Sequence, residues 1–170
     1  LAGNPVFVDY YAKKFGSVCE DMVVVSPDVG SVARARTFAQ KLHMQLAIVD
    51  KRRQKANQCE VMNIIGEVEG RDVVIVDDMI DTAGTLCNAA GAIKARGAKS
   101  VTACATHGVL SGPAIGRIRD SALDEVVLLD TIALPPEQQI EKIKVLSVAP
   151  VLAEAVARIY SDKPVSTLFV

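Results

Sequence analysis

The sequence has no excess of either charge and few aromatic side chains. Its 170 residues include 19 basic and 20 acidic side chains, giving a formal net charge of -1, and only 4% are aromatic. Proteins that bind nucleic acid or anionic membranes usually carry a basic excess, and many nucleic-acid-binding surfaces also stack bases on aromatic rings. The composition therefore argues against nucleic acid and membrane partners, and any basic site must be local.

Long hydrophobic runs and paired cysteines are also missing. No apolar stretch approaches the roughly 18 residues of a membrane span, and the start at Leu1 lacks the charged-then-apolar layout of a secretory signal. The cysteines are scattered without a Cys-x-x-Cys pair, which argues against a structural zinc site or a disulfide framework. We therefore expect reduced thiols and a cytoplasmic protein.

Short β-branched runs alternate with helical patterns along the chain. With 50% hydrophobic residues, the chain is long enough to bury one core. Strands are predicted at 22–25, 46–49, 73–76, 101–105, 126–129 and 145–148, and helices at 5–15, 32–42 and 152–159. A short edge strand is expected at 166–169. This alternation predicts a single α/β domain with a mainly parallel twisted sheet flanked by helices.

The most informative segment is an apolar strand, 73–76, that runs directly into acidic residues and a glycine turn. Asp77 and Asp78 stand at the carboxyl end of this strand, where parallel sheets bind ligands, and they can accept hydrogen bonds from two vicinal hydroxyls of a ribose. The turn at 82–85 offers backbone N–H groups at a helix start, which favours a phosphate. The segment lacks the lysine of the phosphate-binding loop of nucleotide triphosphatases, so a sugar monophosphate is the ligand that suits it best.

Two further segments follow earlier strands. Residues 26–31 place a turn, an acid and a glycine before a helix, a pattern that also suits an ordinary capping turn. Residues 51–55 contain four cations, which taken alone indicate a solvated basic loop. Because the carboxyl ends of parallel strands meet at one sheet edge, we expect all three loops to converge there.

The segment 73–85 resembles the phosphoribosyl pyrophosphate signature of the type I phosphoribosyltransferase superfamily. Ser26-Pro27-Asp28-Val29-Gly30, Asp50-Lys51-Arg52-Arg53, the stretch 105–113 and Val165-Ser166-Thr167-Leu168-Phe169 narrow the resemblance to the ribose-phosphate pyrophosphokinase family. The resemblance covers essentially the whole chain but only the C-terminal half of that family's chain. It therefore implies a phosphoribosyltransferase-like C-terminal domain, residues 1–170, of a longer two-domain enzyme.

The resemblance implies a reaction and a set of site residues. The reaction moves a diphosphoryl group from magnesium ATP to the 1-hydroxyl of ribose 5-phosphate; phosphate or ADP would regulate it, and the intact protein would be a dimer or hexamer. This domain alone would bind ribose 5-phosphate and turn over little ATP. Carried over residue by residue, the roles are ribose binding by Asp77 and Asp78, 5-phosphate binding by Asp81, Thr82, Ala83, Gly84 and Thr85, a pyrophosphate loop of Asp28, Val29, Gly30 and Ser31 with Asp28 as Mg²⁺ ligand, and catalysis by Lys51 and Arg53 on a mobile loop.

Two alternatives stay open on the sequence. A nucleobase phosphoribosyltransferase uses the same Asp-Asp-x-x-Asp-Thr-x-Gly-Thr loop, but the chain has no spare aromatic-rich segment to grip a base. A non-catalytic regulatory homologue is the second alternative, since Ser31 stands where the family commonly has a second glycine. His107 follows a strand end and is expected to be packed or solvent-facing rather than a ligand.

Overall fold

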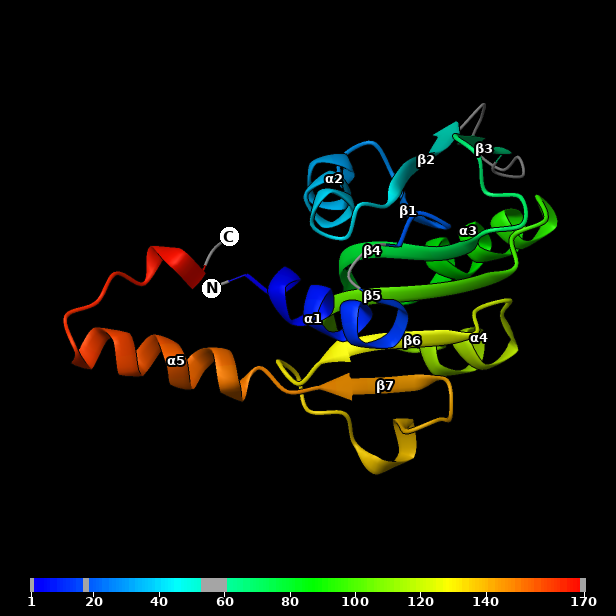
Figure 1. The fold of residues 1–170 in the computed structure, drawn as a ribbon. Coiled ribbons are helices and arrows are strands. Elements are labelled where there is room, and N and C mark those ends of the chain that lie inside the picture. The colour runs from blue at the N-terminus through cyan, green and yellow to red at the C-terminus, as the bar shows by residue number, and fades with distance from the viewer. Residues whose placement is uncertain (1, 17–18, 53–60, 169–170) are drawn as a thin grey trace.

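The computed structural model describes residues 2–16, 19–52 and 61–168. A seven-stranded sheet in the order β3-β2-β1-β4-β5-β6-β7 forms its centre (Figure 1). All neighbouring strands are parallel except β2 and β3. The strands are β1 Met22–Ser26, β2 Gln45–Arg52, β3 Val61–Ile65, β4 Asp72–Ile80, β5 Ser100–Gly108, β6 Glu125–Leu129 and β7 Ile143–Leu146. The helices are α1 Asn4–Phe15, α2 Val32–Lys41, α3 Gly84–Ala95, α4 Ala114–Asp120 and α5 Ala149–Tyr160, with short 3₁₀ turns η1 Pro136–Gln138 and η2 Ser166–Leu168.

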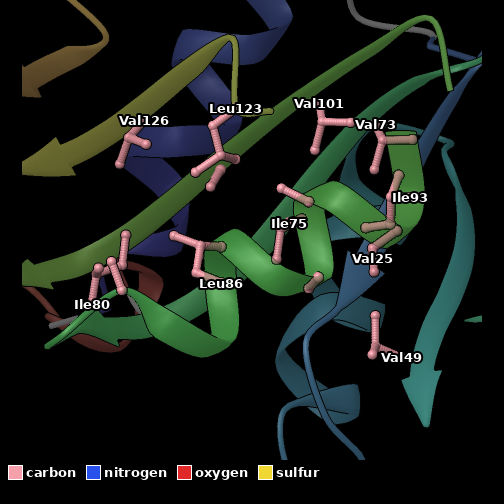
Figure 2. Close-up of a cluster of buried hydrophobic side chains, with 14 of the residues drawn as sticks. Val25, Val49, Val73, Ile75, Ile80, Leu86, Ile93, Val101, Leu123 and Val126 are labelled. Carbon is pink, nitrogen blue, oxygen red and sulfur yellow. The ribbon is translucent and has the colours of Figure 1, made fainter. Parts of the chain in front are cut away.

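The central strands are buried on both faces, which explains their continuous apolar sequences. Successive side chains of a strand point to opposite faces, so Val73 and Ile75 join one hydrophobic cluster while Val74 and Val76 join the other. Figure 2 shows the first cluster, in which Ile93 of α3 lies over the sheet residues. Parallel sheets with helices on both faces have this pattern.

Aromatic side chains fill the opposite face, beneath α1 and α2. Phe7 and Tyr11 of α1 and Phe38 of α2 are fully buried, and the Tyr11 and Phe38 rings meet edge to face with centroids 5.8 Å apart. Such ring pairs add to the stability gained by burying their apolar area. The three layers are thus α1 and α2, the sheet, and α3 and α4 (Figure 1).

The predicted α/β class and parallel sheet are confirmed, but two local predictions are wrong. Residues 166–168 form η2 instead of an edge strand, and Arg158 of α5 donates to the Thr167 hydroxyl at 2.8 Å; Phe169 lies outside the described residues. The last strand runs over Ile143–Leu146 rather than 145–148, since Val148 already caps α5 and Pro150 occupies its first turn. Strand β3, antiparallel to β2, was not predicted.

Helix α5 extends away from the sheet beyond β7 (Figure 1). Its only buried residue is Ala155, and Leu152, Val156 and Ile159 are exposed. Among the described residues, none of the helices has the length and apolarity needed to cross a bilayer.

The two-sided burial of the sheet predicts a large difference between two isoleucines. Ile93 is 0% exposed and Ile159 is 65% exposed. Ile93→Ala should lower the free energy of unfolding by about 2–5 kcal/mol, because it leaves a cavity beneath α3. Ile159→Ala, the matched control, should change it by less than about 0.5 kcal/mol. Denaturant unfolding followed by circular dichroism measures both, and similar losses in the two variants would contradict this layering.

Candidate active site

The loop after β4 is shaped by one residue in a left-handed conformation. Ala83 has φ 58° and ψ 5°, its side chain is buried in the core, and it immediately precedes α3, which begins at Gly84. This conformation turns the chain sharply from strand into helix. The first turn of α3 therefore presents backbone N–H groups at the carboxyl edge of the sheet, as an anion site requires.

A cleft of about 230 Å³ joins this loop to the loop after β1. Its lining includes Asp28 from the loop after β1, Asp77 from β4 itself, and Asp81, Thr82, Ala83, Gly84 and Thr85 from the turn after β4. Asp77 and Asp78 thus lie within β4, which runs past the predicted strand end at Val76 to Ile80. The strands β1 and β4 are parallel neighbours, with Val25 paired to Ile75, so the loops that follow them start at the same sheet edge. The structure thus brings together two of the three predicted loops.

The loop at 26–31 is held by its own hydrogen bonds. The Ser26 hydroxyl donates to the Asp28 carbonyl at 2.7 Å, and the Ser31 N–H donates to Asp28 Oδ1 at 2.8 Å. Asp28 thus closes the turn before α2 and also lines the cleft, while the N-cap of α2 is Ser31 and has no side-chain capping bond. Ser31 has φ −87°, so this position does not need glycine. Binding a phosphate through the Ser31 N–H would require that Asp28 release it.

Asp77 and Asp78 share one cation that the sequence analysis missed. Arg34 of α2 lies with Nη1 3.4 Å from Asp77 Oδ1 and Nη2 2.9 Å from Asp78 Oδ2. The side chains of Arg34, Asp77 and Asp78 are 31%, 26% and 52% exposed, so all three remain accessible at the rim of the sheet. Arg34 stands in the sequence as one of several helical cations, and only the pairing of β1 with β4 brings it to the acids.

The two acids have opposite pKa shifts. Burial raises the pKa of Asp77 from 3.8 to about 6, and the adjacent Asp78 carboxylate adds to the rise while Arg34 opposes it. Burial also acts to raise the pKa of Asp78, but Arg34 and hydrogen bonds to the carboxylate outweigh it, so the pKa lies below its ordinary value. Two neighbouring carboxylates repel each other, and the more buried one takes up the proton first.

A second arginine, Arg117, contacts the turn at 81–85 that leads into α3. Arg117 of α4 donates from Nη1 to the Thr82 carbonyl at 2.9 Å. A Cβ placed on Gly84 would lie 3.2 Å from the same nitrogen, so a larger residue there would require the Arg117 guanidinium to shift by a few tenths of an ångström. The missing side chain of Gly84 therefore lets α4 and the loop pack closely.

The third predicted loop lies mostly outside the described residues. Arg53 and Lys55 are not among them, and for Lys51 the structure describes the backbone alone. Lys51 lies in β2, where it pairs with Met62 of β3. The strand is longer than the predicted 46–49, and the convergence of the catalytic cations on the cleft stays a prediction.

His107 is partly buried, as expected for a packed residue. Its Nδ1 lies 2.9 Å from Thr131 Oγ1, and Thr131 donates to the Thr106 carbonyl at 2.7 Å. The residue borders a separate cavity of about 460 Å³ between α1, β6 and α5. The described cysteines, Cys19, Cys87 and Cys104, are free thiols, and burial raises the pKa of each.

A model of the phosphoribosyl synthetase-associated domain matches residues 53–170, which is more than half of the chain. The chain belongs to that family. A ribose-phosphate pyrophosphokinase of Clostridium perfringens is 57% identical over 99% of this chain and 53% of its own length. The chain thus spans about half the length of the curated relatives it matches.

Solved structures agree with this membership. The phosphoribosylpyrophosphate synthetase of Mycobacterium smegmatis has a TM-score of 0.84 at 34% identity, covering 94% of this chain and 51% of that chain. An adenine phosphoribosyltransferase has a TM-score of 0.56 at 21% identity, covering 74% of this chain and 76% of that chain, which shows a shared fold. The predicted type I phosphoribosyltransferase-like fold is confirmed.

The raised pKa of Asp77 predicts a pH-dependent stability difference. Asp77 titrates near 3.8 when unfolded and near 6 when folded, so the folded state binds more protons between these values and loses stability as the pH rises through them. Asp77→Asn has no such loss. Its stability relative to wild type should therefore improve by about 1–2 kcal/mol between pH 4 and pH 7, against an upper bound near 3 kcal/mol for two pKa units.

Urea unfolding at a series of pH values measures this difference. Asp120→Asn, at the exposed end of α4, controls for the removal of a surface carboxylate. A stability difference between Asp77→Asn and wild type that stays constant or shrinks with rising pH would be contrary to the raised pKa.

Proposed function

We propose that this chain is the ribose 5-phosphate-binding domain of a ribose-phosphate pyrophosphokinase. The observation that carries this proposal is the cleft in which Asp77 and the turn 81–85 face Asp28. Acids at one end of this loop suit the ribose hydroxyls, and the start of α3 at the other end suits the 5-phosphate. The family membership and the ribose-phosphate pyrophosphokinase relatives support the same substrate.

In the proposed reaction, the 1-hydroxyl oxygen of ribose 5-phosphate attacks the β-phosphorus of ATP. A bond forms from that oxygen to the β-phosphorus, the bond from the β-phosphorus to the oxygen that AMP retains breaks, and the hydroxyl proton passes to solvent or a nearby base. This chain would fix the sugar phosphate by Asp77, Asp78 and the turn 81–85. Lys51 and Arg53 would place positive charge near the transferring group, because phosphoryl transfer depends mainly on positioning and charge stabilisation.

The oxygen donors at the cleft suit a Mg²⁺ ion that keeps part of its water shell. Among the described residues no group of three His, Cys, Asp or Glu side chains is placed to hold a metal ion. Asp28 nevertheless offers an exposed carboxylate in the cleft, and Mg²⁺ in kinases is commonly held by one or two carboxylates together with water and substrate phosphates. When bound with ATP, the ion would neutralise phosphate charge. Asp28 is thus the proposed ligand.

The other predictions belong to the longer protein. The proposed second domain, N-terminal to this one, would bind most of the ATP, and phosphate or ADP would regulate a dimer or hexamer in the cytoplasm. A nucleobase phosphoribosyltransferase is not favoured, because the curated relatives that match nearly the whole chain are pyrophosphokinases.

Calorimetric titration with ribose 5-phosphate and magnesium tests the proposal on this chain. Wild type should bind saturably, and Asp77→Asn/Asp78→Asn/Thr85→Ala should reduce the affinity at least about 100-fold, because several hydrogen bonds to charged groups are lost. The matched control is Asp21→Asn/Asp120→Asn/Thr37→Ala, which changes the same residue types at exposed positions away from the cleft. No binding by folded wild type at millimolar ligand would refute the proposal.

A further inference from the structure

Arg34 lies between Asp77 and Asp78 and contacts the carboxylates of both. Nη1 and Nη2 of Arg34 contact different acids, at 3.4 Å and 2.9 Å, so the two arms of one guanidinium hold both carboxylates. The arginine fork is planar and rigid, and it fixes the directions of its partners better than a single ammonium does. The spacing of the two acids therefore depends on the position of Arg34.

The two acids need such a partner because they are adjacent in a strand. Successive side chains of a strand point to opposite faces, which would send Asp77 and Asp78 apart. Both carboxylates of this strand pair nevertheless contact Arg34 of α2, and the Asp78 N–H donates to Asp77 Oδ1 at 2.8 Å. A vicinal diol presents two hydroxyls side by side, so its acceptors must also be held side by side.

Helix α2, which carries Arg34, is fixed against the sheet by buried side chains. Ala35 and Phe38, which follow Arg34 in the helix, are fully buried against the sheet. The Ser31 hydroxyl lies 3.5 Å from Nη1, at the start of the same helix. The lowered pKa of Asp78 agrees with a cation that keeps this acid ionised next to a second carboxylate.

We propose that Arg34 is a positioning residue of the ribose site, which orients the carboxylates of Asp77 and Asp78 to accept hydrogen bonds from the vicinal hydroxyls. The inference rests on the proposed function, since it assigns a further residue to the same site. It concerns recognition of the diol, and it assigns no contact between Arg34 and the 5-phosphate.

A pair of ligands separates these two effects. Ribose 5-phosphate carries the vicinal diol, while 2-deoxyribose 5-phosphate keeps the phosphate and lacks one hydroxyl. Calorimetric titration of both ligands gives an affinity ratio for each variant, and we expect wild type to prefer the ribose form at least about tenfold. Arg34→Gln should weaken ribose 5-phosphate about tenfold and 2-deoxyribose 5-phosphate less than about twofold, so that the ratio collapses.

Two further variants complete the set. Arg34→Lys keeps the charge but cannot span both carboxylates, so its ratio should fall between those of wild type and Arg34→Gln. Arg36→Gln changes an exposed arginine two positions along the same helix and should keep the wild-type ratio. Thermal unfolding establishes that each variant is folded, and if Arg34→Gln does not fold, the ratio in Arg34→Lys decides the question.

The outcomes separate this inference from the proposed function. Equal weakening of both ligands would assign Arg34 to the phosphate, and unchanged or tighter ribose 5-phosphate binding would make Arg34 a competitor for the acids; either result overturns the inference alone. An unchanged ratio in Arg34→Lys, where that variant decides, also overturns it. If folded wild type binds neither ligand, the proposed function fails and the inference fails with it.

Discussion

Burial of β4 on both faces is the constraint from which the site follows. Val73, Val74, Ile75 and Val76 are all fully buried, so the strand must lie at the centre of the sheet with helices on either side. Its parallel pairing with β1 then fixes where both following loops begin. The same hydrophobic burial that stabilises the domain therefore determines which polar loops meet at the cleft.

The two acids in the last part of β4 oppose the stability that the buried residues of the strand supply. Asp77 directly follows a fully buried valine, and burial raises the pKa of its carboxyl to about 6. A chain optimised for stability alone would place a neutral residue here. Arg34 offsets part of this cost by lying within ion-pair distance of both acids. The site is thus a place where local physical preferences are set aside for recognition, as is common in binding clefts.

Features that depend only on residues close together in the sequence could be predicted. The apolar run 73–76 and the turn 82–85 identify a strand and a helix start without knowledge of the rest of the fold. The predicted end of the strand was wrong, because β4 continues through Asp77 and Asp78 to Ile80, where it pairs with β5. Segment 166–168 shows the limit of such reasoning. Its β-type sequence suggested a strand, yet Arg158 binds the Thr167 hydroxyl and the segment forms a 3₁₀ turn beside α5.

Arg34 and Arg117 could not be found in this way. Arg34 meets Asp77 across 43 positions of sequence, and Arg117 meets Thr82 across 35. Each contact requires the order of the strands and the side of the sheet on which the helix lies. Helical periodicity shows that α2 has a buried face, but it does not show which strand end the neighbouring polar residues reach.

The parallel arrangement of β1 and β4 also affects how the chain folds. Met22 pairs with Asp72, and α2, β2 and β3 all lie between these residues in the chain. A parallel pair of this kind forms only after a long loop has closed, which costs conformational entropy before the contacts are made. The loop that carries Asp28 and the part of β4 that carries Asp77 therefore become neighbours only when the chain between β1 and β4 has closed. A chain in which the helices have formed but β1 and β4 are not paired would therefore have no cleft.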